Sequence, residues 1–194
     1  MAELNNSTNS DGNHWMSVSD MMAGLMMVFL FIAISYMVKV KQEKDKIKKI
    51  AVTYNKLQNN LYDDLYDEFE YDLKKWNAEI DSNTISVRFK SPEILFEAGS
   101  DKVRPQFKSI LNDFFPRYLD IITQEKYIND IAEVRIEGHT SSEGKEGMNK
   151  DESYLYNMTL SQNRAFSTLS YVYKNLIPNN YENWSIKHIT ANGL

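Results

Sequence analysis

The feature that most constrains this chain is an uncharged, mostly apolar run from Met21 to Val38. Extended back to Trp15, the run covers about 24 residues, which is roughly 36 Å of helix. About 20 residues suffice to cross the hydrocarbon core of a bilayer, so the sequence predicts a transmembrane helix over residues 15–38. The alternative is a buried helix of a soluble core. Trp15 is suited to one membrane interface, and the lysines after Val38 are suited to the other.

The residues around this run bear on its processing and orientation. No Lys or Arg precedes the run, and it is too long for the apolar region of a signal peptide, so cleavage is not expected. The charged side chains before it are all acidic, whereas six lysines follow within residues 39–49. Taken alone, the positive-inside rule would therefore place the C-terminal side in the cytoplasm.

Asp20 stands at the front of the run, and no other charge follows before Lys39. In one interpretation, Ser19 or Asp20 caps a helix that begins at Met21. In the other, the carboxyl group lies inside the membrane, roughly 7 Å beyond Trp15. A carboxylate there is costly and faces a partner or a water-filled path, which makes it a candidate functional group. The run alone leaves both interpretations open.

Composition excludes several classes of site. The chain has 194 residues, enough for about one soluble domain with appendages. It has no cysteine, which excludes disulfides, thiolate metal sites and a cysteine nucleophile. Its three histidines do not have the spacing of zinc ligands, and a net charge of -5 gives no sign of a nucleic-acid surface. We therefore expect no metal, no cofactor and no nucleic-acid partner.

Residues 39–80 contain no Pro or Gly, and apolar side chains recur there at steps of three or four residues. This spacing predicts a helical linker. The linker is either a stalk that forms a homodimeric coiled coil or a helix that lies along its own domain. The apolar stripe consists of Ile47, Ile50, Tyr54, Leu57, Leu61, Leu65, Phe69, Leu73, Trp76 and Ile80.

From Thr84 onward the pattern predicts a globular domain. Alternating residues predict strands at 84–90, 132–140 and 184–190. Helical periodicity predicts helices at 105–122, with a bend or break at Pro116, and at 154–176. The order is β-α-β-α-β, so we expect an α+β fold, a sandwich in which helices pack on a sheet.

Three stretches of this domain, ILFEAGSDKVRP, VRIEGHTSSEG and NMTLSQNRA, resemble the OmpA-like peptidoglycan-binding domains. The third fits the family pattern Asn-x-x-Leu-Ser-x-x-Arg-Ala. The resemblance covers roughly residues 84–194, and we assign residues 81–194 to this domain. The matching residues are Phe96, Gly99, Ser100, Gly138, His139, Thr140, Asn157, Leu160, Ser161, Arg164 and Ala165.

The resemblance implies a site that binds the diaminopimelate part of peptidoglycan stem peptides. Arg164 would be the carboxylate clamp, because a guanidinium fork pairs bidentately with a carboxylate. The alternative is an ordinary surface arginine. Thr140, Asn157 and Leu160 would lie beside it, although Leu160 is equally suited to the core. His139 is expected to be structural, because no base or nucleophile is arranged around it, and we expect no enzymatic activity.

Two features depart from the family. Ser141 stands where the family usually has an aspartate that meets the ligand's ammonium group, and a serine hydroxyl lacks that charge. Glu143 could reach in to replace it. In addition, the family continues past the turn at Gly193 to a last strand, whereas this sequence stops at TANGL. Either the tail is missing or the domain is shortened.

A single span with one acid, a helical linker and an OmpA-like domain is the layout of MotB-like stator subunits. The Met-rich span is most similar to the ZorB subunits of Zorya anti-phage defence systems. This resemblance implies that Asp20 carries protons, that tail 1–14 is cytoplasmic, and that the domain is periplasmic in a bacterial inner membrane. It implies three partners: a MotA-like multi-span subunit in a pentameric ring, a second copy of the chain, and peptidoglycan.

Three other functions remain as alternatives. The chain could be a passive peptidoglycan anchor, in which Asp20 is only a cap. It could be a flagellar-type stator subunit, although the N-terminal tail lacks the basic residues usual there. A transducer related to ExbD or TolR shares the membrane acid but lacks the OmpA-like motifs.

Overall fold

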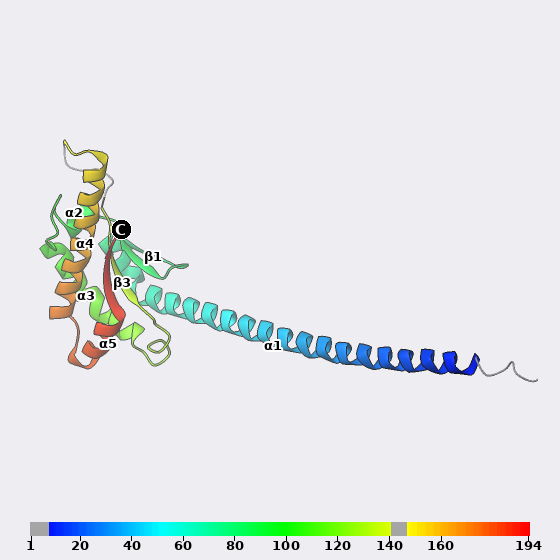
Figure 1. Ribbon diagram of the computed structural model, residues 1–194. Helices are drawn as coiled ribbons and strands as arrows, with labels where there is room; N and C mark the ends of the chain where they lie inside the picture. The colour runs from blue at the N-terminus through cyan, green and yellow to red at the C-terminus, as the bar shows by residue number, and fades with distance from the viewer. Residues whose placement is uncertain (1–7, 141–146) are drawn as a thin grey trace, which may run out of the picture. The chain divides into compact units, whose positions relative to one another are not determined.

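The computed structural model describes residues 8–140 and 147–194 and divides the chain into two compact units, Met1–Asn55 and Lys56–Leu194. A single helix, α1 (Thr8–Trp76), runs through the first unit and provides the first element of the second. The element order is shown by colour in Figure 1.

In the first unit, α1 contains the apolar run. Among the described residues it is the one helix long and apolar enough to cross a membrane. None of its apolar window is buried, which differs from the core helix of a soluble protein. Residues 15–38 are helical throughout, as predicted.

In the second unit, one face of α1 belongs to the hydrophobic core. Leu65, Phe69, Leu73 and Trp76 are buried. The rings of Phe69 and Trp76 lie 5.0 and 6.1 Å from that of Phe114, on α3 (Pro105–Ile122). The second half of the predicted linker is therefore a helix that lies along its own domain, because its apolar stripe packs into that core.

Helix α1 ends at Trp76, four residues short of the expected end, because Asn77 has a left-handed backbone with φ of 50°. Asparagine tolerates this conformation better than most residues. The Asn77 side chain donates to the Ser91 hydroxyl at 2.7 Å, and its carbonyl accepts from the Lys90 amide at 2.9 Å. These bonds turn the chain from the helix into a strand.

An antiparallel hairpin follows, formed by β1 (Ala78–Asp81) and β2 (Ser86–Phe89). Strand β2 lies within the predicted strand 84–90, whereas β1 was expected to be helical. The Asp81 carboxylate accepts hydrogen bonds from the amides of Asn83 and Thr84 at 2.8 and 3.0 Å. This turn reverses the chain, and the Gln58 side chain of α1 donates to the Asn83 carbonyl at its tip.

A short helix, α2 (Pro92–Leu95), leads to α3. Pro105 lies in the first turn of α3, where its missing N–H is not needed. The break predicted at Pro116 is absent, because α3 continues through this residue to Ile122. Packing offsets the lost hydrogen bond, since Phe114, Phe115 and Leu119 around the proline are all buried.

Strands β3 (Val134–Gly138) and β4 (Ile189–Gly193) pair in parallel, with α4 (Lys150–Asn175) in the connection between them. Gly138 and Gly193 are opposite each other in the register. A Cβ atom at Gly138 would overlap the Ser161 carbonyl, and one at Gly193 would overlap the Gln162 backbone. The two glycines therefore allow α4 to pack closely on the end of this sheet.

The strand predicted over residues 184–190 is largely wrong. After a 3-10 turn (Asn179–Tyr181), helix α5 (Glu182–His188) occupies this segment, and β4 begins only at Ile189. Trp184 and His188 alternate with polar residues as in a strand, but they are four residues apart. Their rings stack at 4.6 Å, and His188 Nδ1 is 2.8 Å from the Trp184 carbonyl oxygen.

The second unit is thus an α+β region, as predicted, with helices around small sheets. The described residues form two separate two-stranded sheets, β1–β2 and β3–β4. Helix α4 packs on both β3 and β4. The complete OmpA-like sandwich stays a prediction.

Candidate functional sites

The first candidate group is the Asp20 carboxylate. Asp20 lies well inside α1, which begins at Thr8, and its side chain is exposed on the helix surface. A cap at Ser19 or Asp20 required a helix that begins at Met21. The capping interpretation is therefore wrong, because the helix begins earlier.

Two exposed aromatic residues frame the candidate span of α1. Trp15 is 74% exposed and Tyr36 is 70% exposed. They are about 31 Å apart along the helix, which matches a hydrocarbon core of about 30 Å. Aromatic residues of this kind gather at membrane interfaces. Between Trp15 and Tyr36 the sequence has one charged residue, Asp20. It lies roughly 7 Å from Trp15 along the helix axis, on the membrane side.

The second candidate site lies on the first half of α4. The helix begins with a capping box, in which Asn149 accepts from the Glu152 amide and Glu152 accepts from the Asn149 amide, both at 2.9 Å. Asn157, Leu160 and Arg164 follow at steps of three and four residues, so they lie along one side of α4.

The structure links two of the predicted residues directly. The Thr140 hydroxyl, just after β3, donates to the Asn157 carbonyl at 3.3 Å. Leu160 is half-buried and lies outside the main hydrophobic cluster. Ser141 and Glu143 lie outside the described residues. Within the described part of the chain, the side-chain hydrogen bonds of Arg164 run to other residues.

Arg164 contacts the loop before α3 instead. Its Nε donates to the Ser100 carbonyl at 2.9 Å, and its Nη2 donates to the Glu97 carbonyl at 3.1 Å. Its guanidinium carbon lies 5.0 Å from the centroid of the Phe96 ring. Thus the arginine and the loop residues of the first motif come together, although about 60 residues separate them in sequence.

These contacts use one side of the guanidinium group. A guanidinium has five N–H donors, and Nε with Nη2 form its side-on fork. The end-on fork consists of Nη1, which makes no hydrogen bond among the described residues, and the remaining N–H of Nη2, and it has the geometry for a carboxylate. Burial lowers the pKa of Arg164, while the charges of Tyr156 and Asp101 oppose that shift. The group remains a cation at neutral pH.

His139 is exposed and directly follows the end of β3. Its Nε2 lies 3.5 Å from Glu137, which also pairs with Arg135. This is a surface arrangement of charges.

Comparison with known proteins provides one informative match. Over 163 residues, which are 84% of this chain and 68% of the relative, the sequence is 53% identical to Zorya protein ZorB of Escherichia coli strain Crooks. The chain belongs to the ZorB family. No protein-family profile matches the chain, and no solved structure matches it.

The similarity to ZorB was predicted from the sequence and is confirmed. It extends over most of the chain. The individual roles of Asp20, Thr140, Ser141, Asn157, Leu160 and Arg164 stay predictions.

Sequence reasoning missed the partners of Arg164 in this ZorB-family chain. The acceptors are backbone carbonyls of Glu97 and Ser100. A carbonyl is present at every residue, so nothing in the sequence marks the two that an arginine will use. The one available signal was that Phe96 and Ser100 belong to the same set of family motifs as Arg164.

Proposed function

We propose that this ZorB-family chain is an ion-conducting, wall-anchored, stator-type subunit of an inner-membrane motor that acts in anti-phage defence. Proton-motive force would drive the motor. Family membership supports the defence role, and the candidate span with its single carboxylate supports ion transfer. The proposal assigns no enzymatic reaction to the chain.

In this mechanism, a proton from the periplasm neutralises Asp20, and release to the cytoplasm restores the charge. Each change alters which contacts with surrounding subunits are favourable, so the surrounding ring steps around two copies of the span. Moving one charge through the membrane supplies about 2.3 kcal/mol per 100 mV. The partners would be a MotA-like multi-span subunit in a ring of five and a second copy of this chain.

The α+β unit would hold the complex to peptidoglycan, so that the ring has a fixed part to push against. Arg164 would bind a carboxylate of the stem peptide through its end-on fork. This role requires the unit to be periplasmic and tail 1–14 to be cytoplasmic. Changing Ser141 to the acid that the OmpA-like family has there, S141D, is expected to strengthen binding of stem peptides that carry a free ammonium group.

The observation that carries the proposal is the position of Asp20. It lies in the interior of a continuous helix, on the membrane side of Trp15, with no other charged residue before Lys39. A carboxylate in that environment is costly unless it is used.

The test is Asp20→Asn in the native operon, scored by phage protection, membrane level and co-purification of a multi-span partner. We expect protection to be lost while the complex still assembles. Asp20→Glu keeps an ionisable group and should retain part of the activity. Asp11→Asn is the matched control, because it removes the same charge ahead of the span. Full protection by Asp20→Asn would leave the passive anchor as the better description.

A further inference from the structure

The loop that Arg164 holds, between α2 and α3, carries a carboxylate to which the proposed function gives no role. Asp101 directly follows Ser100, whose carbonyl oxygen accepts from Arg164 Nε at 2.9 Å. Across the planar peptide, the Cα atom of Asp101 is about 2.8 Å from that oxygen and therefore within about 6 Å of Nε. The Asp101 side chain is half-buried. A guanidinium and a carboxylate thus share one small region of the α+β unit.

The charges of Asp101 and Arg164 act on each other without forming an ion pair. Burial lowers the pKa of Arg164, and the charge of Asp101 opposes that shift. Among the described residues, the side-chain hydrogen bonds of Arg164 run to the carbonyls of Glu97 and Ser100 and not to the Asp101 carboxylate. The two charged groups are therefore neighbours that lie beyond hydrogen-bond distance of each other.

The loop is held together by groups other than the Asp101 carboxylate. The Ser100 amide donates to the Glu97 carbonyl at 3.0 Å, and the Ser100 hydroxyl accepts from the Lys102 amide at 3.2 Å. Within the described part of the chain, the carboxylate of Asp101 takes part in no such bond. A partly buried carboxylate is stabilised by a charged hydrogen-bond donor, so Asp101 is suited to a cationic group from outside the chain.

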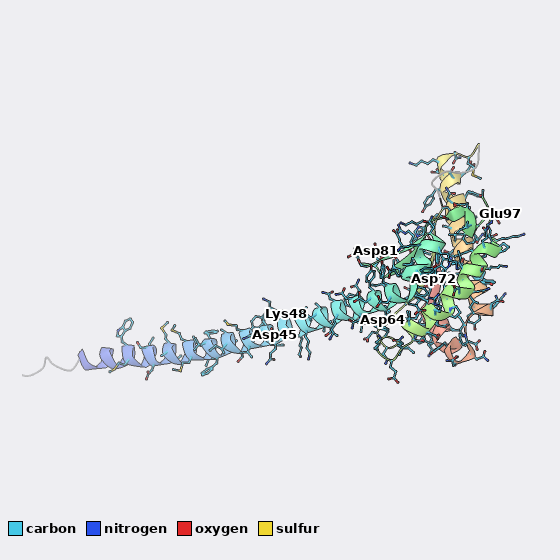
Figure 2. The ribbon with its side chains drawn as sticks, turned by 180° about the vertical axis from the view of Figure 1, so that it is seen from behind. Asp45, Lys48, Asp64, Asp72, Asp81 and Glu97 are labelled. Carbon is cyan, nitrogen blue, oxygen red and sulfur yellow. The ribbon has the colours of Figure 1, made fainter. Side chains whose placement is uncertain are left out.

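Glu97 is the other acid of this loop and is less suited to that role. Its side chain is exposed (Figure 2). Its backbone carbonyl accepts from Arg164, but among the described residues the charges that act on Arg164 are those of Tyr156 and Asp101. Of the two loop acids, Asp101 is therefore the one that acts together with the guanidinium.

Two opposite charges at this spacing suit a ligand that is itself a zwitterion. When a carboxylate and an ammonium group share one carbon, their O and N atoms are about 2.7 Å apart. Each group forms charge-assisted hydrogen bonds of about 2.8 Å. Such a ligand can bridge a guanidinium and a carboxylate that are up to about 8 Å apart. The free amino-acid end of a diamino acid has this chemistry.

We propose that Asp101 binds the ammonium group of the same amino-acid end whose carboxylate Arg164 binds. This assignment rests on the wall-anchoring function proposed above and adds a specificity to it. The site takes stem peptides in which the side-chain end of the diamino acid is free. Cross-linking turns that ammonium group into a neutral amide, so the site disfavours cross-linked peptides. Asp101 also provides the negative charge that Ser141 lacks.

The test is co-sedimentation of the full chain, in detergent, with purified peptidoglycan that contains diaminopimelate. One sample is native, and in a second sample the free amino groups are acetylated. We expect the wild type to bind the native sample about tenfold more tightly, because a hydrogen bond between charged groups contributes about that factor. Asp101→Asn should bind both samples as weakly as the wild type binds the acetylated one. Equal binding of the acetylated sample by the two proteins would show that the variant is folded.

Two further variants make the test specific. Asp101→Glu keeps the carboxylate and should retain part of the preference for native peptidoglycan. Glu93→Gln removes an exposed carboxylate from α2 and should retain all of it. A wild-type preference in Asp101→Asn would overturn the proposal. Equal losses of binding to both samples in Asp101→Asn would also overturn it, because the residue would then act by shaping the loop.

A soluble probe separates this proposal from wall anchoring. Calorimetry compares diaminopimelate with pimelate, which has the same two carboxylates and no ammonium group. The wild type should bind diaminopimelate more tightly, whereas Asp101→Asn should bind the two compounds equally. If the wild type sedimented with neither peptidoglycan sample, wall anchoring would be wrong. Equal binding of the two compounds by the wild type would instead overturn the pairing of Asp101 with an ammonium group.

Discussion

Arg117 of α3 donates from Nη1 to the Asp72 carboxylate of α1 at 2.8 Å. The same guanidinium reaches Glu68 twice, from Nε to the carboxylate at 2.6 Å and from Nη2 to the carbonyl at 2.8 Å. It also lies 4.8 Å from the centroid of the Phe69 ring. Burial alone would lower the pKa of Arg117, but its hydrogen bonds to Glu68 and Asp72 raise it. Arg117 thus stays protonated, and its hydrogen bonds hold the end of α1 against α3.

We predict that Arg117→Ala destabilises the α+β unit by about 1–3 kcal/mol, because Asp72 and Glu68 lose a partly buried charged partner. Arg117→Lys should recover only part of this loss, since lysine keeps the charge but lacks the fork. The measurement is urea unfolding of the full chain in detergent, followed by the fluorescence of Trp76 and Trp184. Arg135→Ala removes two exposed ion pairs, with Glu133 and Glu137, and should cost less. Equal losses in the two alanine variants would contradict the prediction.

The Asp64 carboxylate predicts a dependence of stability on pH. A hydrogen bond from Lys126 and a second from the Tyr127 hydroxyl lower the pKa of Asp64 below its usual 3.8. A carboxyl group with a lowered folded-state pKa stabilises the fold above its unfolded pKa. This contribution disappears as the pH falls through the folded-state pKa. The structure thus predicts that Asp64 helps to resist acid unfolding.

The variant Asp64→Asn should therefore be less stable than the wild type at neutral pH, and the difference should shrink below about pH 4. Unfolding midpoints measured across this range provide the test. Asp63→Asn removes the same charge from an exposed neighbouring position and serves as the control. A stability difference for Asp64→Asn that stays constant down to pH 2 would argue against the assigned role of the carboxylate.

The sequence predicted the long helical segments of this chain well, because long segments give strong apolar signals. The apolar run fixed the position of the candidate span, and the regular apolar stripe predicted the helix through residues 47–76. The stripe could not show what it packs against. A coiled-coil partner and the chain's own α3 both require the same spacing, so only the burial of Phe69 and Trp76 decides between them.

The secondary-structure predictions that were wrong concern short segments in which two sequence patterns coincide. Trp184, Ile186 and His188 alternate as in a strand, yet Trp184 and His188 also meet one turn apart on a helix. At Asn77 the helical stripe continues to Ile80, but a left-handed residue ends the helix. The sequence singled out Arg164 itself. It could not predict the contacts of Arg164 with the loop, because these involve backbone carbonyls.

We predict that Gly138→Ala destabilises the α+β unit by about 1–3 kcal/mol. The added Cβ would overlap the Ser161 carbonyl, which is backbone and cannot move without shifting α4. The exposed neighbour in the same strand provides the control, since Glu137→Ala should have a smaller effect. Thermal unfolding of the full-length variants in detergent gives the comparison. A Gly138→Ala chain as stable as the control would show that α4 can move away from the sheet at little cost.

Arg164 holds the loop of Glu97 and Ser100, and in the proposed function it also binds a ligand carboxylate. We predict that Arg164→Ala reduces co-sedimentation of the full chain with purified peptidoglycan by about tenfold or more, because a charge-assisted bidentate contact is lost. Arg164→Lys should also bind weakly, since an ammonium group cannot form the fork. Asn163→Ala, at the exposed neighbouring position, is the control and should bind as the wild type does.

Hydrogen exchange at the Glu97–Ser100 loop then distinguishes the two functions. If Arg164 acts only by holding the loop, loss of binding in each variant should follow the increase in exchange there. If the end-on fork contacts the carboxylate, Arg164→Lys should lose binding even where it keeps the loop protected. Wild-type binding by both Arg164 variants would remove Arg164 from the wall-binding site and leave it as a purely structural residue of the loop.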